Sequence, residues 1–309
     1  MPRAAGTSLA GQVVGGGIVV DMGRHLDRIV ALDVERRTVR VQPGVVRNEL
    51  NRFLEPQGLF FAPETSTAGW AMIGGMVGNN SCGSNSIAWG STRDHLLRVR
   101  GFLADGSEAT FGPLSSAEFA AKCAGPDTLE TRVYRMIRDL LGDAETRRLV
   151  RDSFPRPEVT RRNTGYALDA LMNASCFAAG GDQPFNFCRL LAGSEGTLFL
   201  GVEYELSLLP LPPPGALVCV HCETVDEALR ATLVVMEDLP AYIAEFDRLL
   251  AEKYGIDCVH YAHAGAGELH LRPLFDLHTP QGLRMFRDVA TDVAALVKKY
   301  RGSLSGEHG

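Results

Sequence analysis

The stretch IGGMVGNNSCGSNSIAWGSTRDH, residues 73–95, is the part of this 309-residue chain that decides the expected fold. It follows the turn Pro63-Glu64-Thr65-Ser66-Thr67, and no charged side chain occurs between Thr65 and Ala88. Small residues let backbone N–H groups approach an anion closely and form a concave nest around it. A long uncharged segment of this kind suits a buried loop that wraps a ligand better than a solvated loop.

A second glycine-rich segment, PRAAGTSLAGQ, occupies residues 2–12. Neither segment contains GxGxxG after a strand, or GxxxxGK followed by Ser or Thr, so neither predicts a Rossmann site or a P-loop. Taken singly, each segment is explained equally well as a mobile surface loop.

Hydrophobic patterning predicts strands and helices on both sides of these segments. Before the proline-rich stretch Leu209–Gly215, it predicts strands at Gly17–Met22, Ile29–Val34, Thr38–Gln42, Leu96–Leu103, Ser107–Phe111 and Gly196–Leu209, a helix at Val45–Leu54, and further helices to about Arg151. After it, the pattern predicts strands at Ala216–Cys222 and Cys258–Leu271, the latter through a glycine-rich turn, and helices at Val225–Glu237, Ala241–Tyr254 and Gln281–Tyr300. We therefore expect a domain boundary at Pro210–Pro214.

The composition is that of an ordinary soluble globular protein, with 45% hydrophobic residues, 22% charged residues and a net charge of -6. It excludes a basic nucleic-acid-binding surface, and the apolar runs are too short for a transmembrane segment. Residues 1–20 lack the features of a signal peptide, so we expect a cytoplasmic protein. The seven scattered cysteines fit reduced thiols, and Cys219 and Cys222 fall in a predicted strand where residues three apart face opposite sides.

Two histidines seven positions apart, His263 and His270, surround a glycine-rich turn. A turn that brings two imidazoles together suits a divalent metal such as Zn²⁺ or Mn²⁺. The chain ends on Gly306-Glu307-His308-Gly309, which supplies a carboxylate and a third imidazole. Lone histidines are more often structural, and we expect that role for the remaining ones: His25, His95, His221, His260 and His278.

Taken together, the motifs resemble the FAD domain of the vanillyl-alcohol oxidase / p-cresol methylhydroxylase (PCMH) superfamily. They are RxxGTSLAGQ at 3–12, VxPGVVRNELNRFLEPQGLFFAPETST at 41–67, residues 73–95, RRNTGYALDAL at 161–171, PFNFCRLLAGSEGTL at 184–198 and GSLSGEHG at 302–309. The chain is most similar to the FAD-linked D-2-hydroxyacid dehydrogenases, which include D-lactate and D-2-hydroxyglutarate dehydrogenases. The resemblance implies an α+β fold, with a PCMH-type FAD-binding domain at 1–210 and a shortened C-terminal FAD-linked oxidase cap domain at 215–309.

The resemblance also implies FAD, bound non-covalently, because no family-type His or Cys for covalent attachment stands out. The positions that match the family's FAD-contacting segments are Arg3, Ala4, Ala5, Gly6, Thr7, Ser8, Gly11, Gln12, Thr65, Ser66, Gly74, Gly75, Gly78, Asn79, Asn80, Gly83, Glu195, Gly196, Thr197 and Val202.

In this family the histidines of HxGxGxxH and the glutamate of GEHG ligate the metal, and His263, His270 and Glu307 match them. The cation would polarise the α-hydroxyl of a 2-hydroxy acid, His308 matches the general base, and the α-hydrogen would leave as hydride to the flavin N5. Arg272, two residues beyond His270 on the same strand face, is our candidate contact for the substrate carboxylate. The alternative for Arg272 is a solvated arginine at a strand end.

The chain departs from the family pattern in three ways. It lacks the strand–helix–strand unit before the first loop, most of the substrate cap, and the segment after GEHG, which many relatives follow with an iron–sulfur domain. We therefore expect a truncated, internally deleted relative. It is either a working dehydrogenase, with an iron–sulfur or other protein as electron acceptor, or a non-catalytic remnant that needs a partner. A reductase of the same FAD fold, such as that of cell-wall precursor synthesis, would not need the two metal motifs.

Overall fold

The computed structural model of the chain describes residues 1–9, 11, 13–163, 165–177, 183–213, 224, 239–263 and 268–304. These residues fall into two compact units, each with its own hydrophobic core. The first unit comprises Met1–Phe154 and Asn163–Pro213, and the second comprises Pro155–Arg162 and the described part of Pro214–Gly306.

A five-stranded sheet forms the centre of the first unit, and every neighbouring pair in it is antiparallel. Its strands lie in the order β3 (Ile29–Asp33), β4 (Thr38–Val41), β8 (Leu200–Ser207), β6 (Leu96–Phe102) and β7 (Glu108–Phe111). Strand β8 is the last of these in the chain but lies between β4 and β6. The sheet therefore brings the segment that precedes β8 close to segments from the first hundred residues.

One face of this sheet is apolar and the other is charged. In β4, Val39 and Val41 are buried while Arg40 between them is exposed, as the alternation of a strand requires. On the charged face, Arg40 and Arg100 both reach Glu203, at N···O distances of 2.9 and 3.7 Å. Such partly exposed pairs contribute about 0–1 kcal/mol each, so the apolar face does most to stabilise the sheet.

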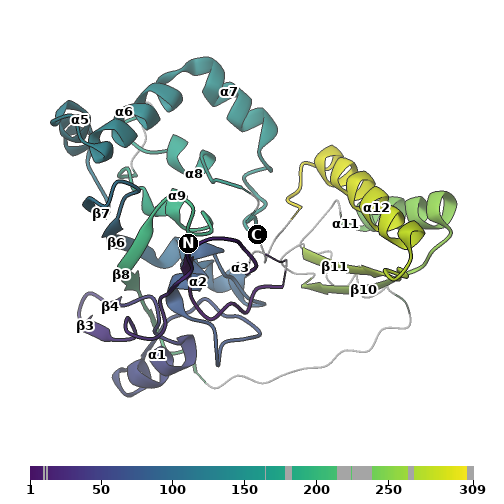
Figure 1. Ribbon diagram of the computed structural model, residues 1–309, viewed down its shortest axis with the longest axis horizontal. Helices are drawn as coiled ribbons and strands as arrows, with labels where there is room; N and C mark the ends of the chain where they lie inside the picture. The colour runs from purple at the N-terminus through teal and green to yellow at the C-terminus, as the bar shows by residue number, and fades with distance from the viewer. Residues whose placement is uncertain are drawn as a thin grey trace. The chain divides into compact units, whose positions relative to one another are not determined.

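Three helices follow β7 and are drawn in teal in Figure 1: α5 (Ser116–Ala124), α6 (Leu129–Gly142) and α7 (Ala144–Ser153). Each begins after a residue whose side chain accepts a backbone hydrogen bond from the first turn, namely Ser115, Thr128 and Asp143. A cluster of packed aromatic rings joins α5 and α6 to β7: Phe111, Phe119, Tyr134, Phe185 and Phe187.

The other elements of the first unit are short, and they include one parallel strand pair (β1–β2) and one antiparallel pair (β5–β9). They are β1 (Pro2–Arg3), β2 (Val20–Asp21), α1 (Arg47–Leu54), η1 (Glu55–Gln57), β5 (Leu59–Phe60), α2 (Ile73–Gly78), α3 (Ser86–Trp89), α4 (Thr92–His95), α8 (Asp169–Met172), α9 (Cys188–Leu191) and β9 (Leu209–Pro210).

Helix α2 lies where the sequence predicts an irregular loop, so that prediction is wrong for residues 73–78. Ile73, Met76 and Val77 have helical spacing and are buried, which shows that packing maintains the turn. Three of the six residues are glycine, the least favourable helix residue after proline. The glycines of this segment disfavour a helix, and the tertiary contacts of its apolar face stabilise it nevertheless.

The second unit contains an antiparallel hairpin of β10 (Cys258–His263) and β11 (Glu268–Pro273). Its helices are α11 (Leu239–Leu249), which continues as the π-helical turn η2 (Leu250–Tyr254), and α12 (Pro280–Lys299). The apolar core of this unit consists of Phe246, Leu250, Val289 and Leu296, with Cys258 and Leu271 of the hairpin packed against it. The helices lie along one side of the hairpin (Figure 1), whereas Val259 and Tyr261 are 63% and 60% exposed.

Most predicted elements are present with shifted boundaries. The strand predicted over Gly17–Met22 is reduced to β2, and the strand Ala216–Cys222 and the helix Val225–Glu237 lie outside the described residues. None of the five cysteines that the structure describes forms a disulfide, and burial raises the pKa of the Cys188 thiol to about 12. Within the described ranges, no helix is long and apolar enough to cross a membrane.

Candidate functional site

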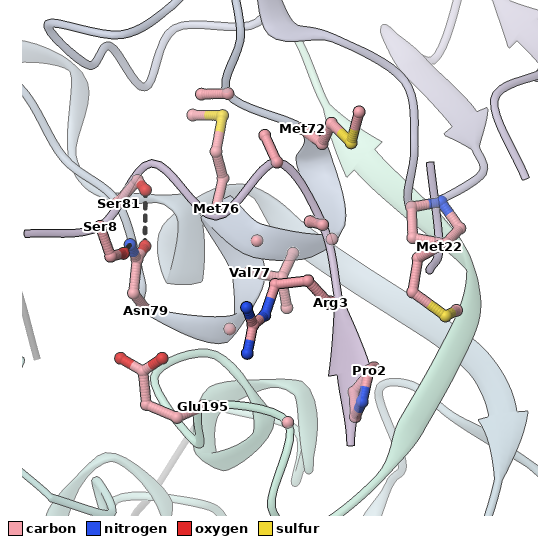
Figure 2. A pocket seen from close by; sticks show the side chains of 18 of the residues that line it. Pro2, Arg3, Ser8, Met22, Met72, Met76, Val77, Asn79, Ser81 and Glu195 are labelled. Atoms are coloured by element: carbon pink, nitrogen blue, oxygen red, sulfur yellow. Dashed lines mark hydrogen bonds between the residues drawn. The ribbon is translucent and has the colours of Figure 1, made fainter. Parts of the chain in front are cut away.

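A pocket in the first unit joins segments that are far apart in the sequence. Its walls are the N-terminal loop, the turn at residues 65–67, helix α2 and the loop at residues 194–196. The sheet lines it through Val99 of β6 and through Gly201 and Tyr204 of β8. The two glycine-rich segments, the turn at residues 65–67 and the SEG part of residues 184–198 therefore surround one cavity (Figure 2).

Glycines in α2 allow the walls of the pocket to approach one another. A Cβ on Gly74 would lie 2.6 Å from the Cβ of Pro43, closer than real Cβ atoms come, and 3.1 Å from its Cα, which is also a tight contact. A Cβ on Gly75 would lie 3.1 Å from the Cβ of Ala4 in the N-terminal loop. These two glycines bring α2 against the segments on either side of it.

Hydrogen bonds between side chains hold the N-terminal loop against the other walls. The Thr67 hydroxyl donates to the Thr7 hydroxyl at 3.3 Å, and the Asn79 amide donates to the Ser8 hydroxyl at 3.2 Å. The Ser81 hydroxyl in turn donates to Asn79 Oδ1 at 2.6 Å, as Figure 2 shows. Each bond joins residues of the predicted ligand-binding segments or their immediate neighbours.

The loop at residues 194–196 is held to the end of α2 by backbone hydrogen bonds. Gly193 N–H donates to Val77 O at 2.9 Å, and Glu195 N–H donates to Gly78 O at 2.8 Å. Glu195 has a φ of 54°, in the left-handed region that side chains other than glycine seldom adopt. The loop therefore has a specific, somewhat strained shape that directs Glu195 toward the pocket (Figure 2).

Among its described lining residues the pocket contains one cationic side chain, that of Arg3, and one carboxyl side chain, that of Glu195. Burial raises the pKa of the Glu195 carboxyl. In the described part of the chain, neither Glu195 Oε1 nor Thr65 Oγ1 has a hydrogen-bond partner, although both atoms are buried. Such atoms are rare and each costs about 1–3 kcal/mol, so both fit a bound ligand that donates and accepts hydrogen bonds.

Most of the expected cofactor contacts line this pocket. They are Arg3, Ala4, Ala5, Gly6, Thr7, Ser8, Thr65, Ser66, Gly74, Gly75, Gly78, Asn79, Glu195 and Gly196. Five other described positions are not among its lining residues: Gly11, Asn80, Gly83, Thr197 and Val202. Gln12 lies outside the described residues. Contact of any of these residues with a cofactor stays a prediction.

The pocket also has lining residues that the sequence did not single out. They include Met22, Met72, Leu191, Phe199 and Tyr204. The alternation of β8 could have indicated Tyr204, because Tyr204 and Leu206 are both buried on one face of the strand. Which segment covers that face depends on the pairing of β8 with β6, which no local pattern reveals.

The expected metal and catalytic residues lie in the second unit or outside the description. In the hairpin, His263 pairs with Glu268, Tyr261 with His270, and Val259 with the exposed Arg272. The His270 ring packs on Tyr261, with ring centroids 5.3 Å apart. Glu307 and His308 are not described, and no group of three potential metal ligands occurs among the residues that are.

Two of the expected structural histidines are described with hydrogen-bond partners for their rings. His95 is buried, with Nε2 2.7 Å from Trp89 O and Nδ1 3.1 Å from the Ser207 hydroxyl. His260 lies 2.8 Å from an Asp247 carboxylate oxygen.

Comparison with known proteins gives matches at both ends of the chain. A family model for the FAD binding domain matches residues 1–112, and one for the C-terminal domain of FAD linked oxidases matches residues 218–309. The chain therefore resembles an FAD binding domain at one end and the C-terminal domain of FAD linked oxidases at the other, in line with the family resemblance of its motifs, and it has the α+β fold expected from them.

Among relatives, the chain is similar to D-2-hydroxyglutarate dehydrogenases. That of Pseudomonas putida is 29% identical over 429 aligned positions, covering all of this chain and 41% of the relative. That of Pantoea ananatis is 37% identical over 236 positions, covering 76% of this chain and 22% of the relative. Glycolate oxidase subunit GlcD of Bacillus subtilis is 24% identical, covering all of this chain and 75% of the subunit.

The chain thus spans less than half the length of these D-2-hydroxyglutarate dehydrogenases. The alignment with the P. putida enzyme has 429 positions, more than the 309 residues of this chain. The relative therefore contains internal segments that have no counterpart here.

Proposed function

We propose that this chain binds FAD non-covalently in the pocket of the first unit and oxidises a D-2-hydroxy acid, D-2-hydroxyglutarate or D-lactate, to the 2-oxo acid. The observation that carries the proposal is the convergence of four Gly-, Ser- and Thr-rich segments on one pocket, in which two buried polar atoms have no partner among the described residues. The match to an FAD binding domain and the similarity to D-2-hydroxyglutarate dehydrogenases support it.

The pocket residues suit the parts of FAD in different ways. Arg3 is a cation that would balance the charge of the pyrophosphate, alongside backbone N–H groups of the N-terminal loop. Thr65 and Glu195 would meet hydroxyl groups of the ligand, because each has a buried oxygen without a partner among the described residues. Bound FAD would supply hydride acceptance, which no side chain can provide.

For the substrate, we propose the residues indicated by the family resemblance. His263, His270 and Glu307 would hold a divalent metal such as Zn²⁺ or Mn²⁺, and His308 would take the hydroxyl proton. The hairpin supports part of this, since the Tyr261–His270 pair lies two residues from the His263–Glu268 pair. Arg272 is exposed on the same hairpin and would contact the substrate carboxylate.

The reduced flavin would need an electron acceptor, and we propose an iron–sulfur or other redox protein in this role. The B. subtilis relative is named as a subunit, which supports a protein partner for this chain. A cytoplasmic location also remains part of this proposal.

A second candidate is a flavin-binding remnant that does not turn over by itself. It is favoured by the internal segments that the P. putida enzyme has and this chain lacks. The two candidates share the pocket but differ in whether a substrate can be oxidised.

Titration of the purified chain with FAD and with FMN tests the cofactor. FAD should bind and FMN should bind much more weakly, because FMN lacks the pyrophosphate and adenosine that the loops would hold. A protein that gains no flavin absorbance with FAD would refute the cofactor assignment.

Anaerobic addition of D- and L-2-hydroxy acids to the FAD-loaded protein separates the two candidates. A dehydrogenase should show bleaching of the flavin absorbance by D-2-hydroxyglutarate or D-lactate, but not by their L-isomers. The reason is that the metal, the base and the flavin would each contact a different group around the α-carbon, which only one enantiomer can satisfy. Bleaching by both enantiomers would contradict this arrangement. No bleaching by either would favour the remnant.

A further inference from the structure

Three buried polar residues form a network behind the pocket. Asn80, Arg93 and Asn163 are 2%, 8% and 4% exposed; the first two lie in the stretch 73–95, and Asn163 comes from a later one. None of the three is among the described residues that line the pocket. Buried polar groups of this kind rigidify a structure when their hydrogen bonds are satisfied.

The Arg93 guanidinium joins this network to the loop that contains Glu195. Its Nε donates to Arg189 O at 2.8 Å and one Nη donates to Ala192 O at 2.7 Å, at the end of α9. The last carbonyls of a helix have no partner within it, so this fork satisfies two groups that the four-residue α9 cannot. A Cβ on Gly193 would lie 2.8 Å from the same Nη, so the guanidinium lies directly behind the loop.

Asn80 joins the network to the segment that follows α2. Its Oδ1 accepts from the Arg93 backbone N–H at 2.7 Å, and its Nδ2 donates to Asn163 Oδ1 at 2.7 Å. Asn163 Nδ2 donates back to Asn80 O at 3.2 Å. Asn80 has a φ of 53°, so these bonds also hold a backbone conformation that asparagine tolerates better than most residues.

The two ends of the network correspond to two walls of the pocket. Asn80 lies two residues beyond α2, and Arg93 holds the residues just before the 194–196 loop. The two walls also meet directly, through Gly193 N–H to Val77 O and Glu195 N–H to Gly78 O. Loss of the fork would remove two hydrogen bonds at the base of the loop. Among the described residues, the loop would then keep these two backbone bonds to α2 and the bonds of Ser194 to Leu191 O.

We propose that Asn80, Arg93 and Asn163 are positioning residues that hold the two walls together before the ligand binds, and that Arg93 acts through its forked hydrogen bonds rather than its charge. The link to FAD affinity rests on the proposed function, but the positioning itself does not. If the loop is ordered for only a fraction of the time, the apparent Kd rises by the inverse of that fraction. Arg93 would thereby control affinity without touching the ligand.

The test compares Arg93→Lys with a matched control, Arg135→Lys. Arg135 also donates to two backbone carbonyls at the C-terminal end of a helix, Cys123 O in the last turn of α5 at 2.7 Å and Gly125 O just after it at 2.9 Å, but it does not line the pocket. Lysine keeps the positive charge in both variants and cannot form the two-carbonyl fork. The pair therefore separates a local effect on the pocket from the general cost of losing such a fork.

The first measurement is hydrogen–deuterium exchange of the ligand-free protein, followed in peptides that contain Gly193 and Glu195. Arg93→Lys should speed exchange at these amides by roughly tenfold or more, because a hydrogen bond to a charged group is worth that much in an equilibrium constant. Arg135→Lys should leave them unchanged. Unchanged exchange in Arg93→Lys would overturn the proposal, whether or not the protein binds FAD.

The second measurement is the Kd for FAD. Arg93→Lys should weaken binding by roughly tenfold, and Arg135→Lys by less than about twofold. Equal weakening by both variants would mean that Arg93 only stabilises the fold, and full affinity in Arg93→Lys would mean that charge suffices; either result overturns the proposal. If the wild type binds no FAD, the proposed function fails, and the exchange measurement still decides the positioning role.

Asn80→Gly keeps the proposal falsifiable if Arg93→Lys does not fold. Glycine accepts the φ of 53° but removes the side-chain bonds to Arg93 and Asn163. Exchange at Gly193 and Glu195 should again increase, and unchanged exchange would overturn the proposal.

Discussion

Gly78 is the last residue of helix α2 and lines the pocket. Its replacement by alanine tests whether the glycine is needed for ligand binding or for the stability of the fold. A Cβ on Gly78 would meet nothing closer than Glu195 Cα at 4.0 Å, and the residue has no left-handed φ. Alanine therefore fits the ligand-free protein. Because alanine is about 0.5–1 kcal/mol more favourable than glycine in a helix, Gly78→Ala should not lower the melting temperature and should raise it by roughly 1–4 °C.

The same methyl group should weaken FAD binding, because Gly78 lines the pocket and an added methyl group would reduce the space beside its backbone. Overpacking by one methyl typically costs about 1–3 kcal/mol, which corresponds to roughly 5- to 150-fold in Kd. Thermal unfolding of the ligand-free protein and a flavin fluorescence titration measure the two effects separately.

Gly142→Ala is the matched control. Gly142 is the last residue of α6, is exposed and has no atom within 4 Å of its would-be Cβ. It should give a similar gain in stability and leave the FAD Kd unchanged. If Gly78→Ala bound FAD as tightly as the wild type, the glycine would not be needed for the ligand. If it melted at a markedly lower temperature, the reasoning about space in α2 would be wrong.

Two further predictions follow from the same structure and a third from the family resemblance. Gly74→Ala should destabilise the first unit by about 1–3 kcal/mol, seen as a lower urea midpoint, because its Cβ would overlap Pro43; an unchanged midpoint would contradict the contact. Burial raises the pKa of the Glu195 carboxyl, so its ionised form opposes folding. Ligand-free wild type should therefore lose stability relative to Glu195→Gln as pH rises through the folded-state pKa, and the two should converge below about pH 4. Urea midpoints that stay parallel from pH 4 to 8 would rule this out. Glu307→Gln should lower the metal content, whereas His308→Asn should keep metal and FAD but abolish flavin reduction; metal analysis with the opposite pattern would reverse the two roles.

The sequence by itself determined the elements whose stability is local. Strand β4 is evident from the alternation of Val39, Arg40 and Val41, since a period of two places the valines on one face. Helix α12 was predicted to within a residue or two at each end, because its apolar positions follow the helical period. The glycine- and serine-rich loops could also be recognised, because the chemistry of a backbone nest depends on small residues that are adjacent in the chain.

Only the tertiary structure decided which secondary structure those segments form and which other segments pack against them. Helix α2 was expected to be a loop, since three of its six residues are glycine. Its apolar face stabilises a helix only when it is buried in the folded protein. Tyr204 joins the pocket because β8 pairs with β6, a contact between residues about a hundred positions apart.

Asn80 illustrates, within the candidate site, the same limit of prediction from sequence. Its motif predicts a cofactor contact, while in the structure its side chain bonds to Asn163, 83 positions later in the chain, and to the backbone of Arg93. Propensity and periodicity act over a few neighbouring residues, so they indicate which segments can surround a ligand. The direction of each side chain depends on long-range contacts, and these exist only in the folded protein.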